Sequence, residues 1–170
     1  FDELAIPYRA VATDLATSKP VVLSHGSISR AMKASASVPG ALEPIEIDGK
    51  LLVDGGISNN MPIDVVKAMG ADIVIAVDIG SPLLTKQEIN STVAVLNQLS
   101  TVLTVNTTKR QKKLLTKKDI ILRPEIDELG TSDFSIMPIA LTLGMKVANE
   151  HIDQLRELSL SVEDYQQHIA

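Results

Sequence analysis

Several residue types that carry distinctive chemistry are missing from this chain. Its 170 residues include no cysteine and no tryptophan, and only two phenylalanines and two tyrosines. The absence of cysteine excludes disulfides, a thiol nucleophile and zinc–thiolate sites. No Gly-x-Ser-x-Gly sequence occurs, and no apolar run approaches the ~20 residues of a membrane-spanning helix. The core is therefore expected to consist mainly of Val, Ile, Leu and Ala.

Positive charge and histidine are also scarce. The formal net charge of -5 argues against a nucleic-acid partner, because phosphate binding needs a clustered excess of cations. His25, His151 and His168 are too scattered to suggest a metal cluster, so we expect no metal. No organic cofactor is implied either. One basic run, 109–118, fits the solvated C-terminal end of a helix better than it fits contact with anionic lipid head groups at a membrane surface.

The length and composition are typical of one folded domain. A chain of this size buries about 70% of its unfolded surface. Its 45% hydrophobic and 22% charged residues are ordinary for a globular protein. We therefore expect residues 1–170 to belong to a single domain. The chain starts at Phe1 without an initiator methionine, which predicts a piece of a longer protein whose localisation cannot be read from this terminus.

The first third of the chain predicts two β-hairpins with a helix between them. The second hairpin turns at Asp48-Gly49, a dipeptide that supplies the positive φ angles of a tight turn. Gly26-Ser27 offers an N-cap for the helix, and Pro39-Gly40 would end it. The predicted elements are strands over 6–14 and 20–24, a helix over 27–36, and strands over 44–47 and 50–53.

The remainder alternates helices and strands. The β-branched run 73–77 is typical of a strand that is covered on both faces in a parallel sheet. Apolar residues at three- and four-residue spacing predict a long helix over 86–115, with a bend or break between Thr101 and Thr108 because Thr and Val are poor helix formers. Further predictions are a helix over 62–69, a strand over 119–123, a loop over 126–134, a helix over 137–158 and a last helical turn through Tyr165. The order predicts an α/β fold, a three-layer α/β/α domain with a mainly parallel sheet.

A carboxylate stands at the end of one predicted strand. The apolar strand that ends with Val53 is followed by Asp54, and then by Gly55 and Gly56. Two residues without side chains allow a sharp turn and leave the carboxylate little surrounding bulk. Taken alone, Asp54 is best interpreted as a turn former whose side chain caps Gly56 or Ile57.

Other strand-end and loop residues are weaker candidates for chemistry. Ser58 and Ser132 each follow a glycine by two positions but lack the second glycine and the strand–turn–helix context of a nucleophile elbow. Asp14 and Asp78 also end predicted strands. We expect these two carboxylates to cap or to bond within loops.

Two further features lie near Asp54 in the sequence. Asn59 or Asn60 is expected to cap the helix that starts at Pro62, rather than to bind substrate. The small, apolar segment 34–40 suits the wall of a cleft for an acyl chain, and it suits a close contact between helix and sheet equally well.

Four blocks of the sequence resemble the patatin-like phospholipases and occur in the same order as in that family. The second block includes Pro39-Gly40, and the third includes the Asp-Gly-Gly sequence followed by Asn-Asn-Met-Pro. The similarity extends from Ile6 to about Tyr165 and so covers nearly all of the chain. The blocks are Ile6–Asp14, Met32–Gly40, Leu51–Asp64 and Gly70–Asp78.

This resemblance implies a function and a role for Asp54. In the family an Asp pairs with a serine nucleophile, so that a Ser-Asp dyad hydrolyses acyl esters, and the serine and a Gly-rich oxyanion loop lie N-terminal to the matched region. The chain therefore resembles the C-terminal half of a catalytic domain that supplies Asp54 as the base, with Gly55 and Gly56 supporting the Asp motif. The substrate-binding residues are not identified.

Several expectations follow from a partial domain. The isolated chain should be inactive as an esterase, and its exposed sheet edge should make it self-associate. The substrate of the whole protein would be a lipid or another acyl ester. The alternative is a patatin-like module without catalysis that serves binding or scaffolding. A nucleotide-binding α/β domain is disfavoured because no Gly-rich phosphate loop followed by Lys is present.

The region from Leu122 to Phe134 and the helix after it is most similar to bacterial patatin-like proteins in which the hydrolase precedes an outer-membrane β-barrel. That similarity implies the periplasm, the outer membrane or secretion as the location. A cytoplasmic location is the alternative.

Overall fold

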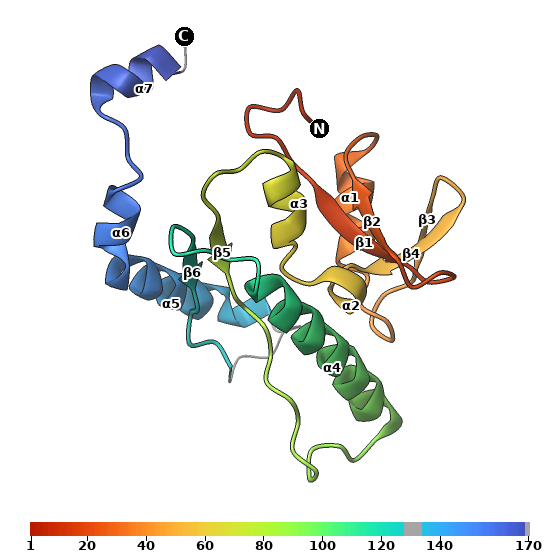
Figure 1. The fold of residues 1–170 in the computed structure, drawn as a ribbon. Coiled ribbons are helices and arrows are strands. Elements are labelled where there is room, and N and C mark those ends of the chain that lie inside the picture. Colours follow the sequence, from red (N-terminus) through yellow and green to blue (C-terminus); the bar gives the residue numbers. More distant parts are fainter. Residues whose placement is uncertain (128–133, 169–170) are drawn as a thin grey trace. The chain divides into compact units, whose positions relative to one another are not determined.

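The computed structural model describes residues 1–127 and 134–168. The chain divides into two compact units (Figure 1). The first unit consists of Phe1–Val74 and Gly80–Asp119, and the second of Ile75–Ile79 and Ile120–Ala170.

The first unit is built on a four-stranded antiparallel sheet with the order β2-β1-β4-β3. Both predicted hairpins are present. The β3–β4 turn has φ of 52° at Asp48 and 70° at Gly49, the positive values that this dipeptide predicted. The strands are β1 (Ala10–Asp14), β2 (Pro20–Leu23), β3 (Ile45–Ile47) and β4 (Lys50–Asp54).

Helices complete the first unit. As predicted, Ser27 caps the first of them, where its side chain accepts the backbone N–H of Arg30. This helix packs on β1 and β4 and buries Ala34 completely, so the core between helix and sheet is small and aliphatic. The helices are α1 (Ile28–Ser35), α2 (Gly56–Asn59), α3 (Ile63–Ala68) and α4 (Thr92–Lys112).

The second unit has a two-stranded parallel sheet followed by helices. Its core consists of Ile120, Leu122 and Val147. The elements are β5 (Ile75–Val77), β6 (Ile120–Leu122), the 3-10 helix η1 (Phe134–Ile136), α5 (Met137–Glu150), α6 (Ile152–Arg156) and α7 (Val162–His168). Among the described helices, none combines the length and the hydropathy needed to cross a membrane.

The α/β class is confirmed, but the predicted strand arrangement is partly wrong. In the part of the chain that the structure describes, only β5 and β6 pair in parallel, and the sheet of the first unit is antiparallel. Short turns join its hairpin strands, and a tight turn forces antiparallel pairing. The run 73–77 is also not covered on both faces: Ala76 is buried, whereas Ile75 and Val77 are 48% and 54% exposed.

The long helix differs from its prediction at its start and in its continuity. It begins at Thr92, where Ser91 caps it, and it runs unbroken to Lys112. The threonine hydroxyls bond to carbonyls of the preceding turn, for example Thr101 Oγ1 to the carbonyl of Asn97 at 2.9 Å. Such bonds satisfy the hydroxyls but do not by themselves strengthen a helix. The packing of α4 on α2 overrides the low intrinsic helix propensity of these residues.

The C-terminal helix differs in the opposite way. The sequence predicts one helix over 137–158, whereas the structure has α5 and α6 separated at His151, whose φ of -106° and ψ of 16° are not helical. The predicted last helical turn is present as α7. The predicted loop over 126–134 falls mostly on residues 128–133, which lie outside the described residues.

Candidate active site

Asp54 occupies the last position of β4, and its backbone is fixed on both sides. It is the register partner of Ala12 in the neighbouring strand β1. Its N–H donates to the carbonyl of Ser37 at 2.9 Å, and its carbonyl accepts the hydroxyl of Thr13 at 2.7 Å. The strand end that carries the carboxylate is therefore held by β1 and by the segment after α1.

The two glycines after Asp54 are required by close packing. A Cβ atom on Gly55 would lie 2.0 Å from the carbonyl oxygen of Val11, so no side chain fits there. Gly55 has φ of -65°, a value open to any residue, and the need is for close approach rather than for unusual backbone angles. A Cβ atom on Gly56 would lie 2.9 Å from Cγ2 of Thr104. The pair lets β4 pass into α2 against β1 and α4.

The Asp54 carboxylate uses its two oxygens differently. Oδ1 accepts the N–H of Gly56 at 2.7 Å, which is the turn contact that the sequence predicted. Oδ2 accepts no hydrogen bond from the described residues. Burial raises the pKa of Asp54, and the Gly56 N–H partly offsets that increase. One oxygen is thus anchored and the other is available to a proton donor.

A cavity of about 230 Å³ adjoins Asp54, Gly55 and Gly56. Tyr8 and Arg9, which precede β1, line it together with the residues that follow α2. Segment 34–40 makes the predicted close contact between helix and sheet, where Ala34 and Ser37 are completely buried, and its Ser35 lines the cavity. All of these residues belong to the first unit.

Asn59 and Asn60 do not cap α3, which corrects the prediction. Pro62 occupies the N-cap position without a side-chain cap bond. Asn59 is 5% exposed and donates from Nδ2 to Asp64 Oδ1 at 3.0 Å. Its Oδ1 is buried without a hydrogen-bond partner among the described residues. The side chains of Asn59 and Asn60 therefore make other contacts, with Asp64 and with α4, rather than the cap that the sequence favours.

Threonines of α4 that hold α2 were not predicted from the sequence. Thr107 Oγ1 lies 3.0 Å from the carbonyl of Gly56 and accepts the N–H of Asn60 at 3.1 Å. Thr108 Oγ1 accepts Nδ2 of Asn60 at 2.8 Å. The available signal was the spacing of Thr104, Thr107 and Thr108, which places three hydroxyls on one face of a helix.

Of the two serines considered from the sequence, Ser58 lies in the described residues, and it does not pair with Asp54. Ser58 lies in α2, and its Oγ is 2.8 Å from Oγ1 of Thr13. That hydroxyl is committed to β1 rather than to the carboxylate. Ser132 lies outside the described residues.

Asp14 bonds within the loop after β1, as the sequence predicted, whereas Asp78 pairs with a residue beyond β6. The carboxylate of Asp14 accepts the backbone N–H of Ala16 at 3.0 Å and the hydroxyl of Thr17 at 2.7 Å, and the Thr17 bond is the main reason that its pKa is lowered. Asp78 is buried and forms an ion pair with Arg123 at 3.3 Å. Both carboxylates have partners, in contrast to Oδ2 of Asp54.

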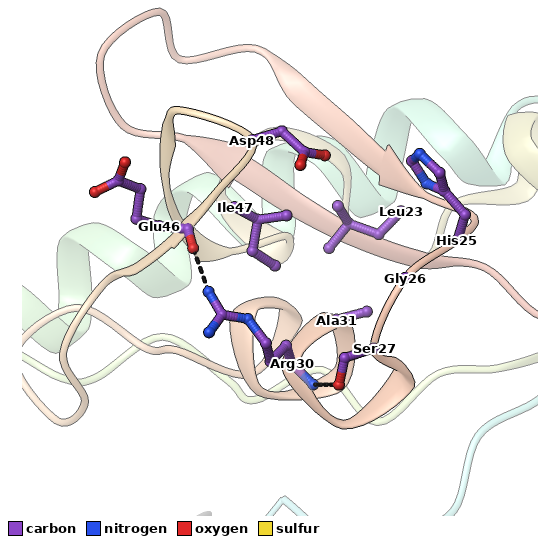
Figure 2. Close-up of a pocket in the computed structure, with 9 residues that line it drawn as sticks. All are labelled: Leu23, His25, Gly26, Ser27, Arg30, Ala31, Glu46, Ile47 and Asp48. Atoms are coloured by element: carbon purple, nitrogen blue, oxygen red, sulfur yellow. Dashed lines mark hydrogen bonds between the residues drawn. The ribbon is translucent and has the colours of Figure 1, made fainter.

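A second cavity of about 320 Å³ lies between the start of α1 and the β3–β4 turn (Figure 2). The polar side chains of His25, Arg30 and Asp48 on its lining are exposed. Arg30 donates to the carbonyl of Glu46 at 2.6 Å. The lining contains neither Asp54 nor the two glycines that follow it.

No group of three or more His, Asp or Glu side chains among the described residues is placed to hold a metal ion. Of the basic run, Lys109, Arg110 and Lys112 fall in the last turn of α4, where cations suit the helix dipole as the sequence predicted.

The fold and this site define an α/β protein that presents a partly buried carboxylate at a strand end. Residues 2–67, which include Asp54, Gly55 and Gly56, match the Patatin family, described as patatin-like phospholipase. The chain is 34% identical over 161 residues to patatin-like phospholipase domain-containing protein 7 of Mus musculus, which covers 78% of this chain and 12% of that protein. These findings support a patatin-like domain.

Other relatives are matched over shorter stretches. An uncharacterized NTE family protein of Mycobacterium bovis is 44% identical over 78 residues, 46% of this chain and 22% of that protein. Patatin-like phospholipase domain-containing protein 6 of Homo sapiens is 44% identical over 82 residues, 47% of this chain and 6% of that protein. The chain spans less than a quarter of each of these relatives. The similarity also extends beyond the bacterial proteins to which the sequence analysis pointed.

Proposed function

We propose that this chain supplies the catalytic carboxylate, Asp54, of a lipolytic acyl-ester hydrolase that works through a Ser-Asp dyad. The observation that carries the proposal is the open Oδ2 of Asp54 beside a cavity, with Oδ1 anchored by the N–H of Gly56. The match to patatin-like phospholipases supports a lipid ester as the substrate. The serine nucleophile would lie in the longer protein, outside residues 1–170.

Ester hydrolysis by a serine requires a base within hydrogen-bond distance of the serine hydroxyl. A serine hydroxyl is a weak nucleophile at neutral pH and becomes effective when a base about 2.6–3.2 Å away takes its proton. Oδ2 of Asp54 would accept that proton as the serine oxygen attacks the ester carbonyl, and the same proton would later go to the leaving alcohol. The anchored Oδ1 keeps the carboxylate from rotating away.

Burial makes the Asp54 carboxylate a stronger base. A carboxylate at its ordinary pKa of 3.8 is a poor base, whereas desolvation raises the pKa of Asp54 and so raises its proton affinity. The carboxylate must be ionised to act. Activity is therefore expected to fall as the pH drops through the raised pKa, above the value for an exposed Asp.

The isolated chain is expected to have no esterase activity. Stabilising the oxyanion needs preorganised N–H donors, and losing one of them costs ~10²–10³ in rate. Those donors and the serine would come from the longer protein. The test compares hydrolysis of a short-chain p-nitrophenyl ester by residues 1–170 and by the protein extended upstream of Phe1.

Each outcome of that comparison is informative. Turnover by the extended protein but not by residues 1–170 would support a site whose serine and oxyanion donors lie outside this chain. Asp54-dependent turnover by residues 1–170 would contradict it. An extended protein that folds but hydrolyses no ester or phospholipid would favour the alternative, a patatin-like module for binding or scaffolding.

A further inference from the structure

We propose that Thr107 is a positioning residue for Asp54, because its hydroxyl holds both ends of the one-turn helix α2 that follows the carboxylate. Thr107 touches neither the carboxylate nor the cavity, and it lies 53 positions after Asp54 in the sequence. The inference rests on the proposed function, since it assigns the residue that keeps the proposed base in place.

The contacts of Thr107 span α2 from its first residue to the residue after its last. Its side-chain oxygen lies 3.0 Å from the carbonyl of Gly56 and accepts the N–H of Asn60 at 3.1 Å. The same oxygen lies 3.0 Å from the carbonyl of Thr104, so one hydroxyl hydrogen is shared between two acceptors. Thr107 is 4% exposed, so water does not replace these bonds.

The need for such a restraint follows from the glycines. Gly56 donates to Oδ1 of Asp54, yet glycine is the residue with the greatest backbone freedom. Gly55 and Gly56 have no side chains that could lock their own angles. Thr107 fixes the carbonyl of Gly56, and Thr108 fixes the side chain of Asn60. Figure 1 shows α2 lying against α4, from which both threonines come.

The electrostatic surroundings of Asp54 make the effect measurable. The Gly56 N–H is the contact that opposes the rise in the Asp54 pKa, so loosening α2 would raise that pKa further. Tyr8 and Arg9 are the other ionisable residues that line the cavity, and Arg9 is paired with Asp2 at 2.6 Å. The remaining segments that pack around Asp54 carry no ionisable residue: 34–38, 56–59 and 104–108.

The test measures kcat, KM and the pH dependence of kcat/KM in the extended protein. Thr107→Val, which removes the hydroxyl at nearly constant volume, is expected to lower kcat by about 10- to 100-fold, as small misplacements of catalytic groups do. KM should change little, and the acidic limb of the pH profile should move to higher pH. Thr107→Ser, which keeps the hydroxyl, should have the wild-type kcat and the wild-type pH profile. Thr101→Val is the matched control, because that hydroxyl bonds only within its own helix.

The outcomes separate this inference from the proposed function. If Asp54→Asn abolishes activity while folded Thr107→Val keeps the wild-type kcat and pH profile, the positioning role is wrong and the proposed function stands. If Asp54→Asn leaves activity unchanged, the proposed function itself fails. Should Thr107→Val not fold, Thr107→Ala removes the same hydroxyl with less bulk. Wild-type kinetics in that folded variant would also overturn the inference.

Discussion

Replacing Asp54 by Asn in the extended protein is expected to lower kcat/KM for ester hydrolysis by about 10³- to 10⁴-fold, a loss of the size seen when a catalytic triad member is disabled. Asn has nearly the same shape and can still accept the Gly56 N–H that now reaches Oδ1 at 2.7 Å. It cannot take a proton from a serine. The measurement is steady-state hydrolysis of a soluble ester and of phospholipid vesicles.

The same substitution should not destabilise the protein. Because the pKa of Asp54 is raised above 3.8 in the folded state, the folded protein holds this proton more tightly than the unfolded chain does. The protonated carboxyl of Asp54 therefore stabilises the fold at low pH, and this stabilisation is lost as the pH rises through the raised pKa. At neutral pH the carboxylate is ionised, and burying its charge is unfavourable. Asp54→Asn is expected to unfold at the same or a higher denaturant concentration.

Asp14→Asn provides the matched control for this prediction. Asp14 also ends a strand of the same sheet, but its carboxylate is committed to the turn that follows β1. Its pKa is lowered, so its ionised form stabilises the fold at neutral pH. Asp14→Asn should lower stability modestly and leave kcat/KM close to the wild-type value. Equal activity of wild type and Asp54→Asn would show that Asp54 is only a turn former.

Gly55→Ala is expected to destabilise the protein by about 3 kcal/mol or more, because overpacking at a rigid site is accommodated only by moving the backbone. The added Cβ would lie 2.0 Å from the carbonyl oxygen of Val11 in β1. Relief requires β1 and β4 to separate where Ala12 pairs with Asp54. The expected observation is a large drop in the urea midpoint of unfolding, accompanied by loss of activity.

The matched control for Gly55→Ala is another glycine-to-alanine change. Gly144 lies within α5, and a Cβ atom there meets nothing within 4 Å. Gly144→Ala should therefore be neutral or stabilising by up to about 1 kcal/mol, from helix propensity. Similar midpoints for the two variants would contradict the account of how the Asp-Gly-Gly segment packs.

The features that the sequence predicted correctly depend on neighbouring residues. The turn at Asp48-Gly49 follows from the positive φ angles that this dipeptide tolerates, and the cap at Ser27 from a hydroxyl next to the first turn of a helix. Asp54 at a strand end was likewise visible as an apolar run, a carboxylate and two glycines. Local stereochemistry decides the first two, whereas the Asp54 segment joins a local pattern to the close packing of Gly55 on β1.

The features that the sequence did not predict depend on tertiary contacts. The β-branched run 73–77 indicates a strand, but its burial depends on neighbours that the local sequence does not contain. Asn59 has a strong preference for helix N-caps, yet in the structure it donates to Asp64 instead. Thr107 looks like a poor helix former, and its contact with Gly56 joins residues 51 positions apart. Residues that position the site are the hardest to recognise from sequence alone.

Covalent labelling of the extended protein with a fluorophosphonate tests directly whether Asp54 activates a serine, because this reagent forms a stable bond to a serine that a neighbouring base activates. We expect rapid labelling of wild type at one serine outside residues 1–170, located by peptide mass spectrometry. Asp54→Asn should be labelled much more slowly at matched folding. Labelling at Ser58 or Ser132, or equal rates in wild type and Asp54→Asn, would contradict Asp54 as the base of a Ser-Asp dyad.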